Sequence, residues 1–209
     1  MKKNFLLACL IGATLAPVTG HAATYALNTG PGDPLAPRNY YQQDPFLGNQ
    51  WLAVQFSIAQ PSPLISVNFF LNGEGTGGTG TFALYAGAAL PTLGTEIFTA
   101  PLTVPPDMVD GWYGVNNLSV QLAAGTYWAA LEGRGSDQVY ASLLSGTANP
   151  AAAYAYSDGV ANYATMAGQL GPDFGAQIVV PEPGVLHLLG AGFMMLGLLR
   201  WRRAGQRTA

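Results

Sequence analysis

Cysteine, histidine and lysine are nearly absent from this chain of 209 residues. The one cysteine (Cys9), both histidines (His21, His187) and both lysines (Lys2, Lys3) lie before residue 23 or after residue 183. The long segment between these ends therefore has no Ser-His-Asp or Cys-His catalytic arrangement, no lysine Schiff base and no zinc site with His or Cys ligands. It also has no disulfide. Carboxylates, hydroxyls and tyrosines are the groups that remain for chemistry.

Basic residues are also scarce in the segment 23–179, which carries two arginines, Arg38 and Arg134, against ten Asp and Glu residues. Its net charge is −8, whereas the whole chain carries −3. An acidic domain without lysine repels phosphate backbones, so we expect no nucleic-acid partner. The segment is long enough to form one domain with its own core.

The N-terminus has the parts of a secretory signal peptide, which we assign to residues 1–22. A basic start is followed by an apolar run over 5–15, and small residues then allow signal peptidase to cut between Ala22 and Ala23. The run is too short to span a membrane as a helix. Leu6-Leu7-Ala8-Cys9 resembles a lipobox, but too few apolar residues precede Cys9 for a lipoprotein signal. The pattern predicts export through the Sec translocon.

The segment 23–179 is typical of an all-β domain. Apolar or alternating runs predict strands at 50–58, 64–71, 81–85, 118–122, 126–131, 139–144 and 174–180. Short strands separated by Gly and Pro favour a single antiparallel β-sandwich. The glycine-rich segment 72–80 predicts a long hairpin loop. The alanine-rich segment 151–156 is the one helix candidate, and it is too short to be stable alone.

The C-terminal segment 180–209 has three parts in a fixed order. Pro181-Glu182-Pro183 is followed by an apolar stretch over 185–199, which we expect to form a single hydrophobic helix, and then by the basic residues Arg200, Arg202 and Arg203. Fifteen residues span roughly 22 Å as a helix, less than a membrane core of about 30 Å. The arginines predict a cytoplasmic end, so the domain would face outward.

This order resembles the PEP-CTERM sorting signal of Gram-negative bacteria. The resemblance implies that exosortase, a membrane transpeptidase, recognises Pro181-Glu182-Pro183 and removes the tail. The protein would be anchored transiently in the inner membrane and then reach the cell surface or the medium. The alternative is a plain C-terminal anchor with a chance Pro-Glu-Pro linker. A helix shorter than a stable anchor argues against it.

The domain itself resembles the jelly-roll ectodomains often attached to such tails, chiefly in LSVQLAAGTYWAAL (118–131). This resemblance implies a two-sheet sandwich with no established activity. We therefore expect a non-enzymatic surface or matrix protein associated with exopolysaccharide or biofilm. The alternative is a carbohydrate-binding module for the cell's own exopolysaccharide. A carboxylate-based glycoside hydrolase is a distant third, because any ten acids offer pairs.

Two kinds of binding site can be sought in this composition. Aromatic rings stack on the C–H faces of sugars, and Tyr154, Tyr156 and Trp112 are the candidates for carbohydrate contact. Strand alternation at Tyr127-Trp128 predicts one ring inside and one outside. The acids Asp107, Asp110, Glu132, Asp137 and Asp158 are expected in loops, where they could offer oxygen ligands to Ca²⁺. No EF-hand spacing is present, so solvated acids are favoured, and we predict no cofactor or metal.

Overall fold

The computed structural model describes residues 23–31, 38–44, 48–106, 109–144, 153–159, 162–165 and 174–182. These residues belong to one compact unit, Ala23–Pro183. They form strands, turns and one short 3-10 turn, η2 (Leu93–Thr95), and every strand pair is antiparallel. The prediction of an all-β antiparallel fold is confirmed. Within these residues no helix has the length and apolarity to cross a membrane.

The strands follow one another closely along the chain. They are β1 (Ala23–Asn28), β2 (Arg38–Asp44), β3 (Gly48–Ile58), β4 (Ser62–Leu64), β5 (Ser66–Ala86), β6 (Glu96–Val104), β7 (Gly111–Val115), β8 (Val120–Leu122), β9 (Gly125–Glu132), β10 (Gln138–Leu144), β11 (Tyr154–Ser157), β12 (Ala164–Thr165) and β13 (Ala176–Pro181). The segment considered as a helix, 151–156, contributes to strand β11 instead.

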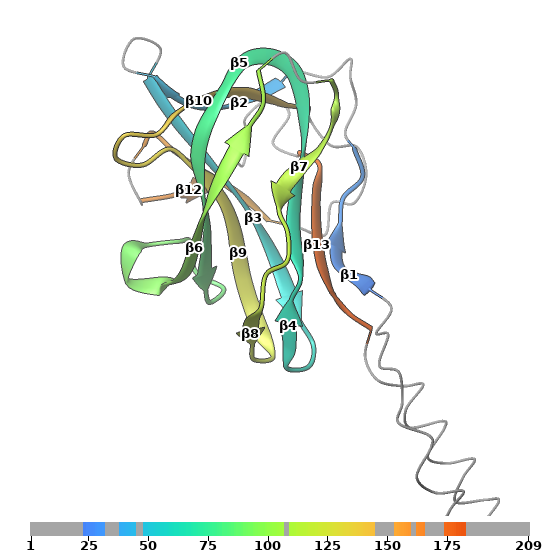
Figure 1. The fold of residues 1–209 in the computed structure, drawn as a ribbon. Coiled ribbons are helices and arrows are strands. Elements are labelled where there is room, and N and C mark those ends of the chain that lie inside the picture. The colour runs from blue at the N-terminus through green and yellow to red at the C-terminus, as the bar shows by residue number, and fades with distance from the viewer. Residues whose placement is uncertain are drawn as a thin grey trace, which may run out of the picture. The chain divides into compact units, whose positions relative to one another are not determined.

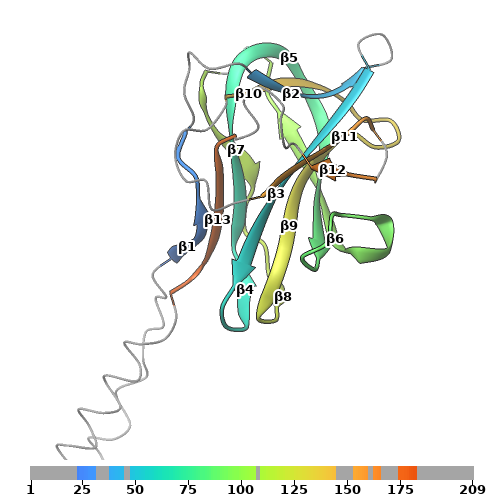
Figure 2. The ribbon, with the colours of Figure 1, turned by 180° about the vertical axis from the view of Figure 1, so that it is seen from behind.

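Two layers of strands face each other, and the long strand β5 belongs to both (Figure 1). The first layer has the order β1-β13-β5-β7 and uses the first part of β5. The second layer has the order β6-β5-β9-β3-β11-β12 and uses the last part of β5 (Figure 2). Strands β10 and β2 connect the layers at one end, and β4 pairs with β8 separately. The arrangement is sandwich-like.

The glycine-rich segment 72–80 lies inside strand β5, so the predicted hairpin loop is wrong. Its residues pair with β10 and β6, which supply the hydrogen bonds that a loop would lack. Gly77 and Gly78 adopt φ values of +67° and +132°, which side-chain-bearing residues rarely adopt. A Cβ atom at Gly77 would lie 2.4 Å from the carbonyl oxygen of Val104. Glycine is therefore needed where β5 passes from one layer to the other.

The main core lies between the layers and is formed by alternate residues of their strands. Val67, Phe69 and Leu71 point inward from the first part of β5, and Phe82 and Leu84 point inward from the last part. Burial of such side chains stabilises each by about 1.5–3 kcal/mol relative to exposure. The core therefore explains why the first part of β5 is a strand of the first layer and the last part is a strand of the second layer.

Candidate functional site

The second layer is buried on its outer face as well as its inner face. Four alanines form a row across its strands by direct register: Ala83, Ala130, Ala53 and Ala155. Large buried aromatic side chains cluster with this row; they are Tyr85, Trp128, Trp51 and Tyr163. The small alanines leave room for these rings, and the result is a second hydrophobic cluster, separate from the main core.

Glu132, the last residue of β9, lies at the edge of this second cluster and is completely buried. Its Oε1 atom accepts hydrogen bonds from the hydroxyl of Tyr85, at 2.5 Å, and from the hydroxyl of Tyr163. Its Oε2 atom accepts one from Nε of Arg134 at 2.5 Å. Burying a carboxyl group without such donors would cost several kcal/mol. The site is therefore a buried acid held by two phenols and a guanidinium.

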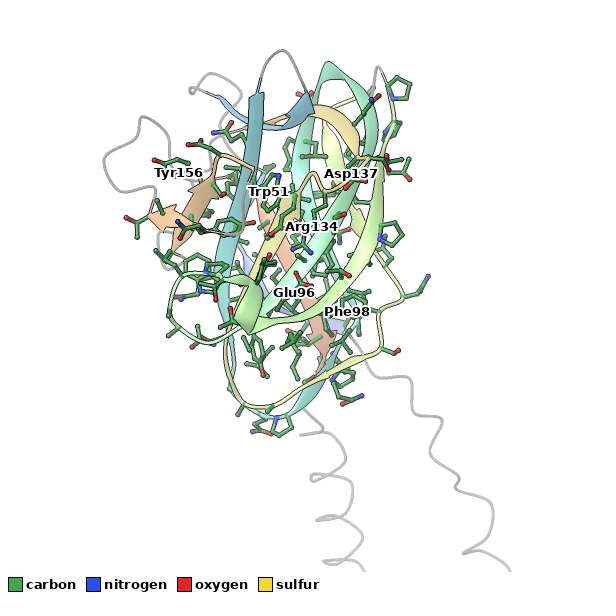
Figure 3. The ribbon with its side chains drawn as sticks, turned by 90° about the vertical axis from the view of Figure 1, so that its left-hand side faces the viewer. Trp51, Glu96, Phe98, Arg134, Asp137 and Tyr156 are labelled. Carbon is green, nitrogen blue, oxygen red and sulfur yellow. The ribbon has the colours of Figure 1, made fainter. Side chains whose placement is uncertain are left out.

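Arg134 joins this buried acid to the surface. Its Nη2 atom donates to the Tyr85 hydroxyl at 2.7 Å and to Oε2 of Glu96 at 2.6 Å. The Arg134 and Glu96 side chains are each 25% exposed. The guanidinium carbon also lies 5.8 Å from the centre of the Trp51 ring, within cation–π distance. Figure 3 shows Arg134 between Trp51 and Glu96. One cation thus contacts two acids from β9 and β6.

The turn after β9 fixes the position of Arg134. Oδ2 of Asp137 accepts hydrogen bonds from the backbone N–H of Arg134 at 2.9 Å and from the Thr81 hydroxyl at 2.8 Å. The backbone N–H of Asp137 donates to the Arg134 carbonyl at 2.8 Å, and Gly135 supplies a φ of +57° within the turn. Asp137 therefore acts on the cluster through the turn, as a positioning residue.

Burial and the neighbouring acid change the ionisation of the phenols. Desolvation, followed by the charge of Glu132 and its hydrogen bond, raises the pKa of Tyr85 and of Tyr163 well above the usual range. Desolvation acts to lower the pKa of Arg134, but the hydrogen bond to Glu96 and the charge of Glu132 outweigh it and raise the pKa. Both phenols therefore stay protonated as donors, and Arg134 stays charged.

The chemistry available to this cluster is limited by its burial. Glu132 is 0% exposed, and both of its carboxylate oxygens accept hydrogen bonds from protein donors. A glycosidase needs two acids that flank a substrate bond, whereas Glu132 and Glu96 flank the Arg134 guanidinium. In this structure the cluster links β5, β6 and β9 to the segment that carries Tyr163. Its contacts are those of a structural ion-pair network.

The residues predicted for carbohydrate contact do not lie together. Tyr154 and Tyr156 share one face of β11, as predicted, but it is the inner face of the second layer. Tyr154 is buried, packs on Phe174 and donates a hydrogen bond to the Phe174 carbonyl, so it is not available to a sugar. Tyr156 is half-buried on β11, and Trp112 is half-buried on β7 of the first layer. Tyr156 and Trp112 therefore belong to different layers.

Tyr127 and Trp128 point to opposite faces of β9, but both are buried. Tyr127 lies in the main core and stacks on Phe56, whereas Trp128 lies in the second cluster. The prediction that one ring would be outside is wrong, because the outer face of this layer is covered. In the described part of the chain, the indole N–H groups of Trp51 and Trp128 are buried without a hydrogen-bond acceptor.

The acids considered as calcium ligands are dispersed. Glu132 is a buried strand residue, Asp137 holds a turn, and Asp110 and Asp158 are exposed in separate bends. Asp107 lies outside the described residues. Among the residues that the structure describes, no group of three or more His, Cys, Asp or Glu side chains is placed to hold a metal ion. The prediction that Glu132 lies in a loop is wrong.

The predicted sorting residues lie at the end of the domain or beyond it. Pro181 is the last residue of β13 and is half-buried, and Glu182 is exposed. Ala23 is the first residue of β1 and is exposed. The predicted signal peptide, with Cys9 and Ala22, lies outside the described residues. So do Pro183, the predicted helix over 185–199 and the basic residues Arg200, Arg202 and Arg203.

Comparison of the chain with protein-family models, with curated proteins and with solved structures gives no match. The site therefore has to be interpreted from its own geometry. Sequence reasoning missed Arg134, Tyr85 and Tyr163 as partners of Glu132. The available signal was weak: an isolated acid ends the apolar run of β9, and one of the two arginines of the segment 23–179 follows two residues later.

Proposed function

We propose that this chain is an exported, exosortase-processed surface or extracellular-matrix protein without enzymatic activity, built on a jelly-roll-like sandwich. The observation that supports it is the pairing of the first and last strands. Ala23 of β1 lies opposite Pro181 of β13, Thr24 opposite Val180, and Tyr25 opposite Val179. The start of the proposed mature chain and the start of the Pro-Glu-Pro motif are neighbours in one sheet.

This pairing suits removal of both end segments. Cleavage between Ala22 and Ala23 takes no residue from β1, and cleavage after roughly residue 183 takes none from β13. Val180 is buried in the core, so the last strand is anchored up to the motif, while Glu182 beside it is exposed and accessible to an enzyme.

The geometry of the acids supports the non-enzymatic part of the proposal. Glu132 and Glu96 share the cation Arg134, and Asp137 holds a turn. These three acids therefore have partners within the protein, which favours a structural role over proton transfer to a substrate.

Mass spectrometry of surface-released protein from an exosortase-positive cell tests the sorting proposal. We expect a chain that begins at Ala23 or Thr24 and lacks everything after roughly residue 183. Glu182→Ala should leave a full-length species in the inner membrane, because it changes the motif without touching the core. The matched control Asp158→Ala removes another exposed acid and should be processed normally. Intact Trp201 and Arg203 on the released protein would overturn the proposal.

A second candidate function is carbohydrate binding to exopolysaccharide. The observation that favours it is an aromatic pair outside the main core: Phe70 of β5 and Trp112 of β7 meet edge to face, with ring centres 5.3 Å apart. Both rings are half-buried and belong to neither hydrophobic cluster. A glycan array distinguishes this candidate from a purely structural protein, which would bind none of the sugars.

A further inference from the structure

The outer face of the first layer differs in chemistry from every other face of the sandwich. Along β5 and β13 the inward residues are apolar and buried, and the residues between them point outward. The strand segments that form this layer, β1, β13, β7 and residues 66–71 of β5, contain no charged residue. Outward-pointing side chains of this layer are therefore all neutral.

Amide side chains form a row across three strands of this face. By register, Asn28 of β1 lies opposite Gln177 of β13, and Gln177 lies opposite Asn68 of β5. Asn28 is exposed, and Gln177 and Asn68 are half-buried. An amide offers both donors and acceptors, which is the pattern that a sugar hydroxyl requires, since it both donates and accepts.

Aromatic rings lie on both sides of the amide row. One step along the strands, Phe70 and Trp112 form the edge-to-face pair. One step in the opposite direction, Tyr25 of β1 is 52% exposed and lies opposite Val179. The strand rise and the strand spacing put Tyr25 and Trp112 about 20 Å apart, diagonally across the layer. That length suits an extended oligosaccharide.

Two glycines allow close backbone packing beside these side chains. Gly114 of β7 ends the amide row beside Asn68, and a Cβ atom at Gly114 would lie 1.9 Å from the Val67 carbonyl oxygen. Gly175 lies beside Phe70, where a Cβ atom would lie 2.7 Å from the Phe70 Cβ atom. Both positions therefore require glycine for the close packing that supports Asn68 and Phe70.

We propose that this face, formed by Tyr25, Asn28, Gln177, Asn68, Phe70 and Trp112, binds a neutral polysaccharide. The proposal deepens the second candidate function and rests on it. Aromatic faces stack on sugar C–H groups, and the amides bond the hydroxyls between them. The ligand is uncharged because the face supplies no cation, and the segment 23–179 carries a net charge of −8 that repels anionic chains.

Native affinity electrophoresis of the purified protein tests the proposal. Gels contain dextran, hydroxyethyl cellulose or galactomannan as neutral probes, and alginate as an anionic probe. We expect at least one neutral polymer to retard the protein, and alginate not to. Retardation should persist in high salt, because no ion pair contributes.

Three variants locate the site. Trp112→Ala should weaken binding by roughly tenfold, as expected when an aromatic anchor is truncated. Tyr25→Ala removes an exposed ring with little effect on folding, and it should also weaken binding measurably. Leu93→Ala is the control, because Leu93 is an exposed apolar side chain of η2 and belongs to no strand of this layer. It should bind as the wild type does.

The outcomes separate this proposal from the others. If no neutral polymer retards the protein, or if only alginate does, the proposed binding face and the carbohydrate candidate are both overturned. The tail-processing proposal is not affected, because mass spectrometry tests it separately. If Tyr25→Ala and Trp112→Ala are retarded as strongly as the wild type, the proposed binding face is overturned, but carbohydrate binding elsewhere on the protein is not. An equal loss of binding in Leu93→Ala would show that the effect is not specific to this face, and would also overturn the proposed binding face.

Discussion

Replacing Arg134 by Met tests whether the buried Glu132 depends on its cation. Methionine keeps much of the side-chain length and removes the guanidinium, so Glu132 loses the donor to its Oε2 atom while staying bonded to Tyr85 and Tyr163. Removing one partner of a buried ion pair costs about 3–5 kcal/mol, because the other charge stays buried. Arg134 is itself 25% exposed, so water can partly solvate the remaining charge. We therefore expect the free energy of unfolding to fall by about 3 kcal/mol, the lower end of that range.

The matched control changes the other acid on the same guanidinium. Glu96→Gln removes a partner that is 25% exposed, and ion pairs at this exposure contribute about 0–1 kcal/mol to stability.

A double-mutant cycle measures the coupling between the buried acid and its cation. The effect of Arg134→Met on stability should be smaller in a Glu132→Gln background, because the neutral amide no longer needs a cation. We expect a coupling free energy of about 2 kcal/mol between positions 132 and 134.

Urea unfolding followed by tryptophan fluorescence measures these free energies, and Trp51 reports on the site because it contacts Arg134. All four members of the cycle, with Glu96→Gln as the fifth protein, should unfold in one transition with similar dependence on urea. Equal effects of Arg134→Met and Glu96→Gln, or a coupling indistinguishable from zero, would refute the view that Glu132 is a buried charge compensated by Arg134.

Three further predictions concern packing, backbone and pH. Trp128→Ala should cost about 3–5 kcal/mol in urea unfolding, toward the lower end because its buried N–H has no acceptor; a neutral effect would contradict the second cluster. Gly77→Ala should cost at least about 2 kcal/mol, from its positive φ and the clash with Val104, whereas exposed Gly94→Ala should be tolerated in the same assay. Unfolded tyrosine ionises near pH 10.0, and the pKa of Tyr85 and Tyr163 is raised in the folded state. The unfolded chain therefore binds fewer protons above that pH, and the free energy of unfolding falls by up to about 1.4 kcal/mol per pH unit per tyrosine. Tyr163→Phe should reduce that slope, and an unchanged slope would argue against the Glu132 contacts.

Much of the strand content could be predicted because apolar runs carry it. Strands β3 and β9 contain the apolar runs 51–54 and 127–131, and they lie in a layer that is buried on both faces, where such runs are expected. Strand β5 could not be predicted as one element. Its middle is glycine-rich and shows no side-chain pattern, and its pairing with β10 and β6 is non-local. Local composition indicated a loop, whereas the sheet hydrogen bonds determine the outcome.

The contacts of Glu132 could not be predicted for a related reason. Tyr85 is 47 residues away along the chain and Tyr163 is 31 residues away, so no short motif joins them. Strand alternation does place Trp128 and Glu132 on one face of β9, opposite to Tyr127. It does not say whether that face is covered. The packing of the second cluster, to which Tyr163 belongs, decides that, and the acid is buried where a solvated one was expected.

The two outer faces of the sandwich should respond oppositely to substitution. The covered face of the second layer keeps Glu132 and Arg134 partly or wholly out of water, so a change there alters the free energy of unfolding. The neutral face of the first layer holds amides and exposed Tyr25, and desolvating it moves no ion out of water, which favours contact with a ligand. We therefore expect Arg134→Met to lower stability and to leave affinity for a neutral polysaccharide unchanged in the folded protein. Tyr25→Ala should weaken that affinity and change stability by less than about 0.5 kcal/mol. Measuring both quantities on both variants tests the separation, and a single variant that lowers stability and affinity together, while still folded, would show that the two faces are coupled through β5.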